Sequence, residues 1–225
     1  MIRAILGDEL FDKAIHTFVR DNAHNTVETI DLLRAIDKAT GYNLMFLFDQ
    51  YVFRGGHPDY KVAYSWEADS KLAKLTVTQK QAKKNSDSKE LFDLKIPVGF
   101  GYISKNSHVP QFQTFVLRIH QPEQSFYFPL EKKPSFISFD VNNNFLKTVS
   151  IQYPVTELKK QLKYDPDPIS RIYAAAALAK KGGLEAIKSL GKSLTEDPFW
   201  GVRIEVAKKL GKIKLNQAAT ALKEG

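Results

Sequence analysis

The sequence predicts a multidomain α+β protein with three parts: a short helical segment, a seven-stranded antiparallel β-sandwich, and α-helical repeats. Apolar residues recur every three to four positions up to about residue 55, and then alternate in short runs over the next hundred residues. After residue 154, several leucine, alanine, arginine and Asp-Pro positions recur at a constant spacing. We therefore expect domains at residues 1–56, 57–153 and 154–225.

The composition indicates a globular protein. The chain has 225 residues, 43% of them hydrophobic, which is enough to form a buried core. It lacks the run of about 18 to 20 apolar residues that a membrane span requires. The absence of cysteine excludes disulfides and thiolate zinc sites, and is typical of a reducing compartment. We expect a cytoplasmic protein with no membrane partner.

Positive charge is in excess, with 33 Lys and Arg against 25 Asp and Glu. The excess is concentrated at residues 159–163, 179–183 and 207–214, which fall on predicted helix faces and helix ends. Such charge runs are typical of solvated surfaces, so we expect no nucleic-acid partner. The alternative is that the basic repeats bind an acidic partner, which would appear as salt-sensitive association.

Residues 1–56 predict three helices after a short helical stub. Asp8 is expected to cap the first helix and Thr29 the second, which closes at Gly41. The first helix is expected to bury a stripe made of Phe11, Ala14, Ile15, Phe18 and Val19. The side chains expected on its exposed face are Lys13, His16, Thr17 and Arg20.

The end of this segment is predicted in the stretch from Leu44 to Val62. One face of its helix carries Leu44, Leu47, Phe48, Tyr51 and Val52. Gly55 and Gly56 are expected to supply a left-handed cap, and Pro58 makes the chain leave extended. From Tyr60 onward, apolar residues occur at every second position, which is the spacing of a β-strand. Gly55, Gly56 and Pro58 therefore form the predicted structural boundary between the helices and the β-domain.

Alternating apolar residues predict short strands up to residue 153. The seven candidates are residues 60–66, 71–79, 91–100, 113–119, 125–130, 135–141 and 145–152. Turn-forming residues separate several of them, at 85–88, 104–107, 121–122 and 142–144. Strands with one apolar face and this spacing are typical of an antiparallel β-sandwich.

Catalytic and metal-binding patterns are missing from the sequence. The histidines are not at spacings expected of metal ligands; they are His16, His24, His57, His108 and His120. Asp140 interrupts an apolar strand before three asparagines, which favours an Asx-turn over an acid catalyst. Neither a nucleophile elbow nor a glycine-rich phosphate loop occurs. We expect no catalytic, cofactor-binding or metal-ligating residue in this chain.

The last segment contains an internal repeat of 32 residues. Leu158, Ala175, Leu178 and Ala186 recur as Leu190, Ala207, Leu210 and Ala218, and Asp165 and Arg171 recur as Asp197 and Arg203. The stretch DPFWGVRIEVAKKLG at 197–211 resembles the short HEAT-like repeats named after phycobilisome lyases. We therefore expect about two HEAT-like repeats. Asp165, Arg171, Asp197 and Arg203 are expected to stabilise them, each arginine reaching the acidic turn of an adjacent unit, rather than to form a binding surface.

Several other segments resemble the aminopeptidase N family of zinc metallopeptidases. FDQYVFRGGHPDYKV at 48–62 is similar to that family's passage from the last catalytic-domain helix into a β-domain. LGDELF at 6–11 and TIDL at 29–32 resemble its preceding helices, while LTVTQ at 75–79 and LKIPV at 94–98 resemble strands of its β-domain. In this order, the segments resemble the C-terminal portion of such a peptidase, running into HEAT-like repeats.

The resemblance implies a larger polypeptide that removes N-terminal residues from peptides with zinc. That family's metal site needs H-E-x-x-H and a distal glutamate, and neither occurs here. We expect this chain alone to hydrolyse nothing and to hold no cofactor, with zinc in the parent protein. Its expected role is to support the catalytic domain and shape peptide access. The expected partners are an upstream catalytic domain, further repeats downstream, and a peptide substrate. The alternative is a scaffold or protein-interaction module of a peptidase-like protein without a working zinc site.

Overall fold

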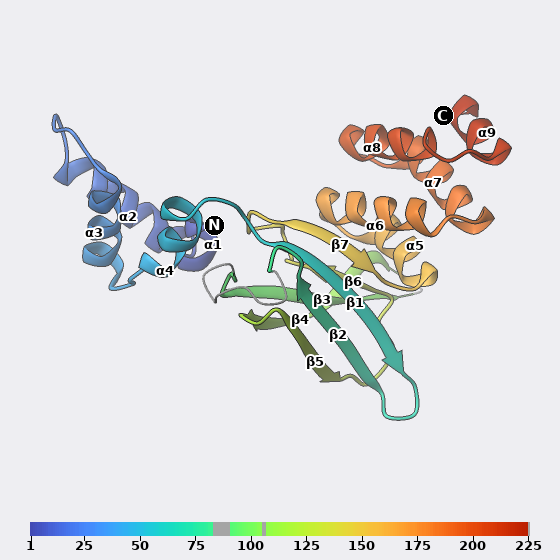
Figure 1. Cartoon of the computed structure of the whole chain (residues 1–225), viewed down its shortest axis with the longest axis horizontal. Coiled ribbons are helices and arrows are strands. Elements are labelled where there is room, and N and C mark those ends of the chain that lie inside the picture. Colours follow the sequence, from blue (N-terminus) through green and yellow to red (C-terminus); the bar gives the residue numbers. More distant parts are fainter. Residues whose placement is uncertain (83–90, 105–106, 225) are drawn as a thin grey trace. The chain divides into compact units, whose positions relative to one another are not determined.

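The computed structural model describes residues 1–82, 91–104 and 107–224, with the backbone alone for Ser107 and His108 (Figure 1). The chain divides into two compact units, Met1–His57 and Pro58–Gly225. The predicted turn at 85–88, and residues 105–106 of the turn at 104–107, lie outside the described residues.

The unit Met1–His57 is built from short helices. They are α1 (Ile2–Leu6), α2 (Asp8–Asp21), α3 (Thr29–Thr40), α4 (Met45–Phe48) and a π-helical turn (Asp49–Phe53). α2 and α3 pack against each other. Its buried apolar side chains include Ala14, Leu33, Ala35, Ile36, Leu44, Leu47 and Phe48. α3 ends at Gly41 in the left-handed conformation, as predicted.

The buried face and the caps of these helices differ from the prediction. Thr17 is 7% exposed, whereas Ile15 is 36% and Val19 61% exposed, so the predicted buried stripe of α2 is wrong at these three positions. The reason is that α3 is the main neighbour of α2 within this unit, and it covers a narrower line of side chains than the apolar pattern suggests. The N-cap of α3 is Glu28 rather than Thr29, because Glu28 and Asp31 form a capping box. The N-cap residue of α2 is Gly7, and Asp8 is the first residue of the helix, so the prediction that Asp8 caps this helix is wrong.

The helix that follows Leu44 changes its winding before it ends. After Phe48 the chain makes a π-helical turn, and this wider turn moves the following side chains around the helix axis. Val52 is therefore 54% exposed, although the α-helical period predicted it on the buried face. Arg54 is extended, with φ −107° and ψ 125°, so the predicted left-handed glycine cap is wrong. Gly56 adopts a φ of +100° two residues later, in the connection to the next unit.

The first part of Pro58–Gly225 is a sandwich of two sheets. Its strands are β1 (Asp59–Glu67), β2 (Leu72–Gln79), β3 (Leu94–Ser104), β4 (Ser107–Ile119), β5 (Glu123–Pro129), β6 (Phe136–Phe139) and β7 (Thr148–Gln152). Within the described residues, one sheet has the strand order β5-β2-β1-β7 and the other β4-β3-β6. Each predicted strand is present, with ends that differ by a few residues.

One strand pairing departs from the predicted antiparallel sandwich. β7 lies parallel to β1, with Val149 opposite Tyr60 and Ile151 opposite Val62, whereas the other pairings are antiparallel. Alternating apolar residues indicate which face of a strand is buried, but they carry no information about its direction. The direction follows from the connection, and the chain crosses from β6 in one sheet to β7 in the other.

Aromatic side chains and glycines fill the sandwich tightly. Phe100 of β3 contacts Phe128 of β5 across the two sheets, with ring centroids 5.0 Å apart. Within one sheet, Phe136 of β6 lies over Gly101 of β3, where a Cβ atom would come within 2.5 Å of the ring. The missing side chain of Gly101 therefore lets this ring lie against the neighbouring strand.

The second part of this unit consists of α-helical repeats. The helices are α5 (Val155–Tyr164), α6 (Pro168–Lys181), α7 (Leu184–Glu196), α8 (Trp200–Leu210) and α9 (Asn216–Glu224). α6 packs on α8, and α7 packs on both α8 and α9. The repeat-related leucines 158 and 190, and 178 and 210, are all fully buried at 0% exposure. The 32-residue sequence repeat is therefore a repeat of structure.

The repeats and the sandwich share an interface within this unit. α5 contacts β4 and β6, and α6 contacts β7. In Figure 1, α5 and α6 lie beside the strands, and α7 to α9 continue the stack away from them. Among the helices that the structure describes, none combines the length and the apolar character needed to cross a membrane.

Candidate functional site

A buried arginine joins the turns between successive repeats. Arg171, in α6, is 6% exposed, and it pairs with both carboxylate oxygens of Asp197: its Nε donates at 2.8 Å and its Nη2 at 2.9 Å. Its Nη1 donates to the backbone oxygens of Asp165, at 2.9 Å, and Pro166, at 3.2 Å. One guanidinium therefore holds the Asp-Pro turn of its own repeat and that of the next repeat.

Arg203 occupies the same position in the next repeat, but its environment is different. Its Nη1 donates to the backbone oxygen of Asp197 at 2.6 Å, which repeats the contact between Arg171 and Asp165. Arg203 is half-buried, and it forms no ion pair with a carboxylate in the part of the chain that the structure describes. The structure thus brings together the four residues predicted to stabilise the repeats. Arg171 reaches the acidic turn of the next repeat, whereas Arg203 contacts the turn of its own repeat, so the prediction that each arginine reaches an adjacent unit is wrong for Arg203.

The carboxyl group of Asp165 has a pKa above the usual value for an aspartate. Asp165 is 2% exposed, and its Oδ1 accepts a hydrogen bond from the backbone N of Asp167 at 3.1 Å. Burial raises the pKa of Asp165 to about 6, and the hydrogen bond from Asp167 offsets this effect in part. This turn therefore contains an acid that changes charge near neutral pH.

Polar groups are also buried where the repeats meet the sandwich. Glu157 of α5 is 1% exposed, and its Oε1 lies 2.6 Å from Nζ of Lys133 in the loop before β6. Burial, followed by the negative charge of Glu157, raises the pKa of the Tyr64 hydroxyl on β1. The hydroxyl oxygens of Ser138 and Ser170 lie 3.3 Å apart in the same interface. Such buried polar contacts favour one arrangement of α5 and α6 on the sandwich, because a displaced partner would leave buried polar groups unsatisfied.

The sandwich contains an ion pair that the sequence did not reveal. Asp140 pairs with Lys147, and both side chains are fully buried. Asp140 Oδ2 also accepts from the backbone N of Phe145 at 2.9 Å, while Lys147 Nζ donates to Asn143 Oδ1 at 2.8 Å. Asp140 does accept a hydrogen bond from a backbone N of its own loop, but from a residue five positions ahead, so the predicted Asx-turn is wrong. Lys147 was missed because a lysine seven residues from an aspartate forms no recognisable pattern.

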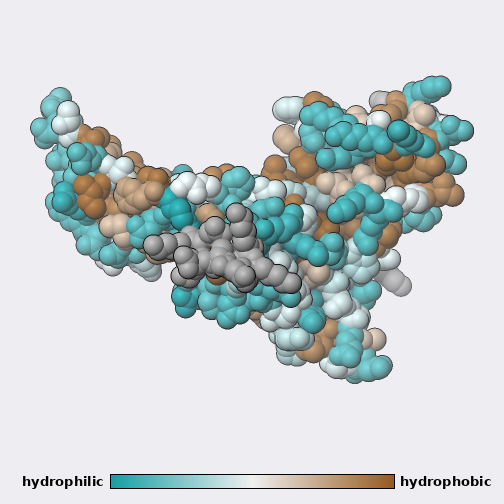
Figure 2. Space-filling view, viewed as in Figure 1, coloured by the Kyte–Doolittle hydropathy of each residue, from teal (hydrophilic) through white to brown (hydrophobic). Residues whose placement is uncertain are grey.

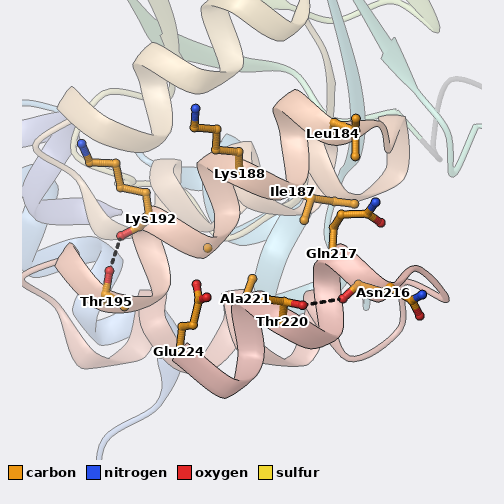
Figure 3. A pocket seen from close by; sticks show the side chains of 11 residues that line it. Leu184, Ile187, Lys188, Lys192, Thr195, Asn216, Gln217, Thr220, Ala221 and Glu224 are labelled. Atoms are coloured by element: carbon orange, nitrogen blue, oxygen red, sulfur yellow. Dashed lines mark hydrogen bonds between the residues drawn. The ribbon is translucent and has the colours of Figure 1, made fainter.

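A groove lies between α7 and α9 (Figure 3). It has a volume of about 670 Å³, and its apolar lining includes Leu184, Ile187 and Ala221. The helices approach closely at Gly191, where a Cβ atom would lie 3.1 Å from Cβ of Ala221. The Thr220 hydroxyl donates to a backbone oxygen of its own helix, so it is already satisfied. The groove is therefore a gap between two packed helices and offers a ligand few polar contacts.

A second groove lies between α5 and α7 and has a volume of about 480 Å³. Lysines line it from both helices: Lys159, Lys160 and Lys163 on α5, and Lys192 on α7. Ser189 and Ser193 of α7 add hydroxyl groups to this lining. Apolar surface from Leu162, Tyr164 and Pro198 and the carboxylates of Glu196 and Asp197 complete a lining that is mixed in character and includes the four lysines.

Apolar side chains are exposed at the surface of the repeats. Leu184 is 63% exposed, Trp200 60% and Ile204 45%. Phe199 lies against Trp200, with ring centroids 5.5 Å apart. Figure 2 shows hydrophobic patches over the repeats, within a surface that is otherwise largely hydrophilic. These patches are candidate contact surfaces for other protein segments.

The described residues do not fit the zinc ion that the sequence resemblance implies. No three His, Asp or Glu side chains among them are grouped so that they could hold a metal. His120 is engaged with Gln124, whose Nε2 lies 3.4 Å from the ring Nδ1. The side chain of His108 lies outside the part of the chain that is described.

Comparisons with known proteins agree with this architecture. A family model for a domain of unknown function with an Ig-like fold (DUF3458) matches residues 56–154. A model for HEAT repeats matches residues 155–225. A comparison with curated protein sequences finds no match. Among solved structures, the chain is similar to the aminopeptidase A of Legionella pneumophila, crystallised in complex with aspartic acid, with a TM-score of 0.66 and 16% sequence identity.

The extent of the structural match is unequal for the two proteins. It covers 99% of this chain but 28% of the aminopeptidase. The predicted resemblance to a segment of an aminopeptidase that runs into HEAT-like repeats is therefore confirmed at the level of the fold. A likeness at this identity carries no information about activity, because one fold supports many functions.

Proposed function

We propose that this chain is the non-catalytic C-terminal portion of a zinc-dependent aminopeptidase, where it supports the catalytic domain and shapes the access of peptides. The observation that carries the proposal is the match of 99% of this chain to 28% of an aminopeptidase. Nearly the whole chain thus corresponds to a minor part of a peptidase fold. In this proposal zinc is held elsewhere in the polypeptide, whose other segments are the partners of this chain. The whole polypeptide, of which this chain is a part, acts on peptides in the cytoplasm and binds neither nucleic acid nor a membrane.

The environments of the charged side chains support a structural role. Catalytic acids and bases must come within hydrogen-bond reach of a substrate. Here the carboxylates of Asp140, Glu157 and Asp197 are buried and paired with lysine or arginine side chains of the same chain. Such groups are engaged within the fold and are not free to act as catalytic acids or bases.

The first test is on the purified chain. We expect no bound zinc by elemental analysis and background hydrolysis of an aminoacyl chromogenic substrate. Stoichiometric zinc with turnover would contradict the non-catalytic role. A variant that replaces all five histidines would then show whether the activity belongs to this chain or to a contaminant.

The second test adds this chain to a separately produced catalytic domain of the same polypeptide. We expect a complex and a narrower range of cleaved peptide lengths, measured with a series of peptides that share one N-terminal residue. An unrelated protein at equal concentration is the control. If that polypeptide instead lacks H-E-x-x-H and the distal glutamate, the result favours the alternative, a scaffold or protein-interaction module without a working zinc site.

A further inference from the structure

The groove between α5 and α7 contains lysines whose charge is not neutralised. Lys160 and Lys163 are both exposed, and neither pairs with any carboxylate that the structure describes. They are three residues apart on α5, so their side chains share one side of the helix and their charges reinforce each other. Lys163 Nζ lies 4.9 Å from the ring centre of Tyr164, which also lines the groove. This wall of the groove therefore presents positive charge.

The other lysines of the groove limit the size of the positive region. Lys159 lies 2.6 Å from a carboxylate oxygen of Glu185, and Lys192 lies 3.7 Å from one of Glu196. The charges of Lys159 and Lys192 are therefore offset by neighbouring carboxylates, which leaves Lys160 and Lys163 as the unpaired lysines of this lining among the described residues. A nucleic acid backbone needs a continuous basic track, whereas a peptide with a few carboxylates needs a short one.

A buried hydroxyl group in the groove has no partner. Ser193 is 9% exposed, and its Oγ forms no hydrogen bond with any described group. The neighbouring Ser189 differs, because its hydroxyl donates to the backbone oxygen of Glu185 at 2.9 Å. A buried hydroxyl without a partner costs free energy unless a ligand or water satisfies it. The Oγ atom itself has almost no accessible surface, so a ligand in the groove reaches it only with a small shift of the surrounding side chains.

We propose that the groove between α5 and α7 binds an acidic peptide segment. Carboxylates of the peptide pair with Lys160 and Lys163, and one of its polar groups meets the Ser193 hydroxyl. The volume of about 480 Å³ suits a few residues of an extended chain. The groove between α7 and α9 also has two lysines, Lys188 and Lys192, but Lys192 lies near Glu196 and the carboxylate of Glu224 lines the same groove. The proposal does not depend on the aminopeptidase assignment, since it concerns binding by this chain alone.

The test is fluorescence anisotropy with the full chain and a labelled eight-residue peptide that contains four glutamates. We expect saturable binding that weakens as salt is raised, while the same peptide with glutamine in place of glutamate does not bind. The variant Lys160→Glu/Lys163→Glu should weaken binding at least about tenfold. Ser193→Ala should weaken it about threefold, since it removes one hydrogen bond.

The matched control is Lys180→Glu/Lys181→Glu. These exposed lysines lie in the last turn of α6, as Lys163 does in α5, and their replacement changes the net charge by the same amount. We expect less than about a twofold change in affinity for this variant. Circular dichroism of each variant checks that the fold is retained, and a variant that fails this check is replaced by the corresponding lysine-to-glutamine pair.

Three results would overturn the proposal. The first is equal loss of affinity in both double variants, which would show attraction to net charge without a site. The second is equal binding of the glutamate and glutamine peptides by the unaltered chain. The third is tighter binding of a single-stranded oligonucleotide of equal charge, with the same dependence on Lys160 and Lys163, which would identify a nucleic acid as the occupant.

Discussion

The β-sandwich and the helical repeats each bury an ion pair, but the two pairs connect very different parts of the chain. Asp140 and Lys147 are seven residues apart and lie in the connection between two strands of the sandwich. Arg171 and Asp197 are 26 residues apart and join successive turns of the repeats. The first pair fixes the shape of a single loop, whereas the second fixes the alignment of stacked units. The same chemistry therefore acts locally in one region and between repeats in the other.

Breaking the sandwich pair should have the largest effect. Asp140→Asn keeps an acceptor for Phe145 N, and asparagine tolerates the φ of 60° at this position, but Lys147 is left buried and charged. We expect the free energy of unfolding to fall by about 3–5 kcal/mol. The measurement is urea unfolding followed by Trp66 fluorescence in a Trp200→Phe background, since these are the two tryptophans of the chain.

The control for this experiment removes both charges. Asp140→Asn/Lys147→Met should be more stable than Asp140→Asn alone, because no uncompensated charge remains in the interior. If the single variant loses less than about 1 kcal/mol, the pair does not hold the loop as described.

The second prediction separates the two arginines of the repeats. Arg171→Met leaves the buried carboxylate of Asp197 without its cation, and should cost about 3 kcal/mol. Arg203→Met removes a hydrogen bond to a backbone oxygen, and should cost about 1 kcal/mol. Unfolding followed by Trp200 fluorescence in a Trp66→Phe background measures both. Equal losses would mean that the repeat position, and not the ion pair, determines the contribution.

The third prediction concerns pH, and here the substitution is expected to stabilise the protein rather than destabilise it. Because burial raises the pKa of Asp165 from its usual value of 3.8 to about 6, the folded state binds this proton more tightly than the unfolded state. The contribution of Asp165 to stability is fully present below about pH 4 and is lost as the pH rises through about 6. Asp165→Asn should therefore be more stable than the unaltered chain by about 2 kcal/mol at pH 8.

The pH dependence of this difference is the decisive readout. Thermal unfolding of both proteins between pH 4 and pH 8 should show the gain from Asp165→Asn shrinking toward zero at the acidic end. A gain of constant size over this range would show that the variant acts through packing, and not through the titration of the carboxyl group.

The smallest effects should distinguish the packing of the two regions. Gly101→Ala places a methyl group within 2.5 Å of the Phe136 ring, and should destabilise the sandwich by about 1–2 kcal/mol. Gly191→Ala meets Ala221 at 3.1 Å, but it also removes a glycine from a helix interior, which is worth about 0.5–1 kcal/mol. We expect the two terms of Gly191→Ala to nearly cancel in urea unfolding. A large loss at Gly191 would show that α7 and α9 cannot separate even slightly.

The predicted features that the structure confirms depend either on residues close together in the sequence or on a fixed spacing between repeats. Strand positions follow from alternation, and the helix end at Gly41 follows from the left-handed conformation that glycine adopts. The 32-residue spacing of leucines 158 and 190 correctly predicts two equivalent, fully buried positions. The same spacing singles out Arg171 and Asp197 as equivalent in position to Arg203 and Asp165, although it does not indicate which arginine pairs with a carboxylate.

What the sequence alone determined is therefore the order of the three parts, the strand positions and the period of the repeats, because backbone geometry fixes which nearby side chains share a face. The tertiary structure decided which distant groups meet: the parallel pairing of β7 with β1, the burial of Lys147 beside Asp140, and the difference between Arg171 and Arg203. Those features depend on contacts between elements that are distant in the sequence. A local pattern of residues does not specify which distant elements it will contact.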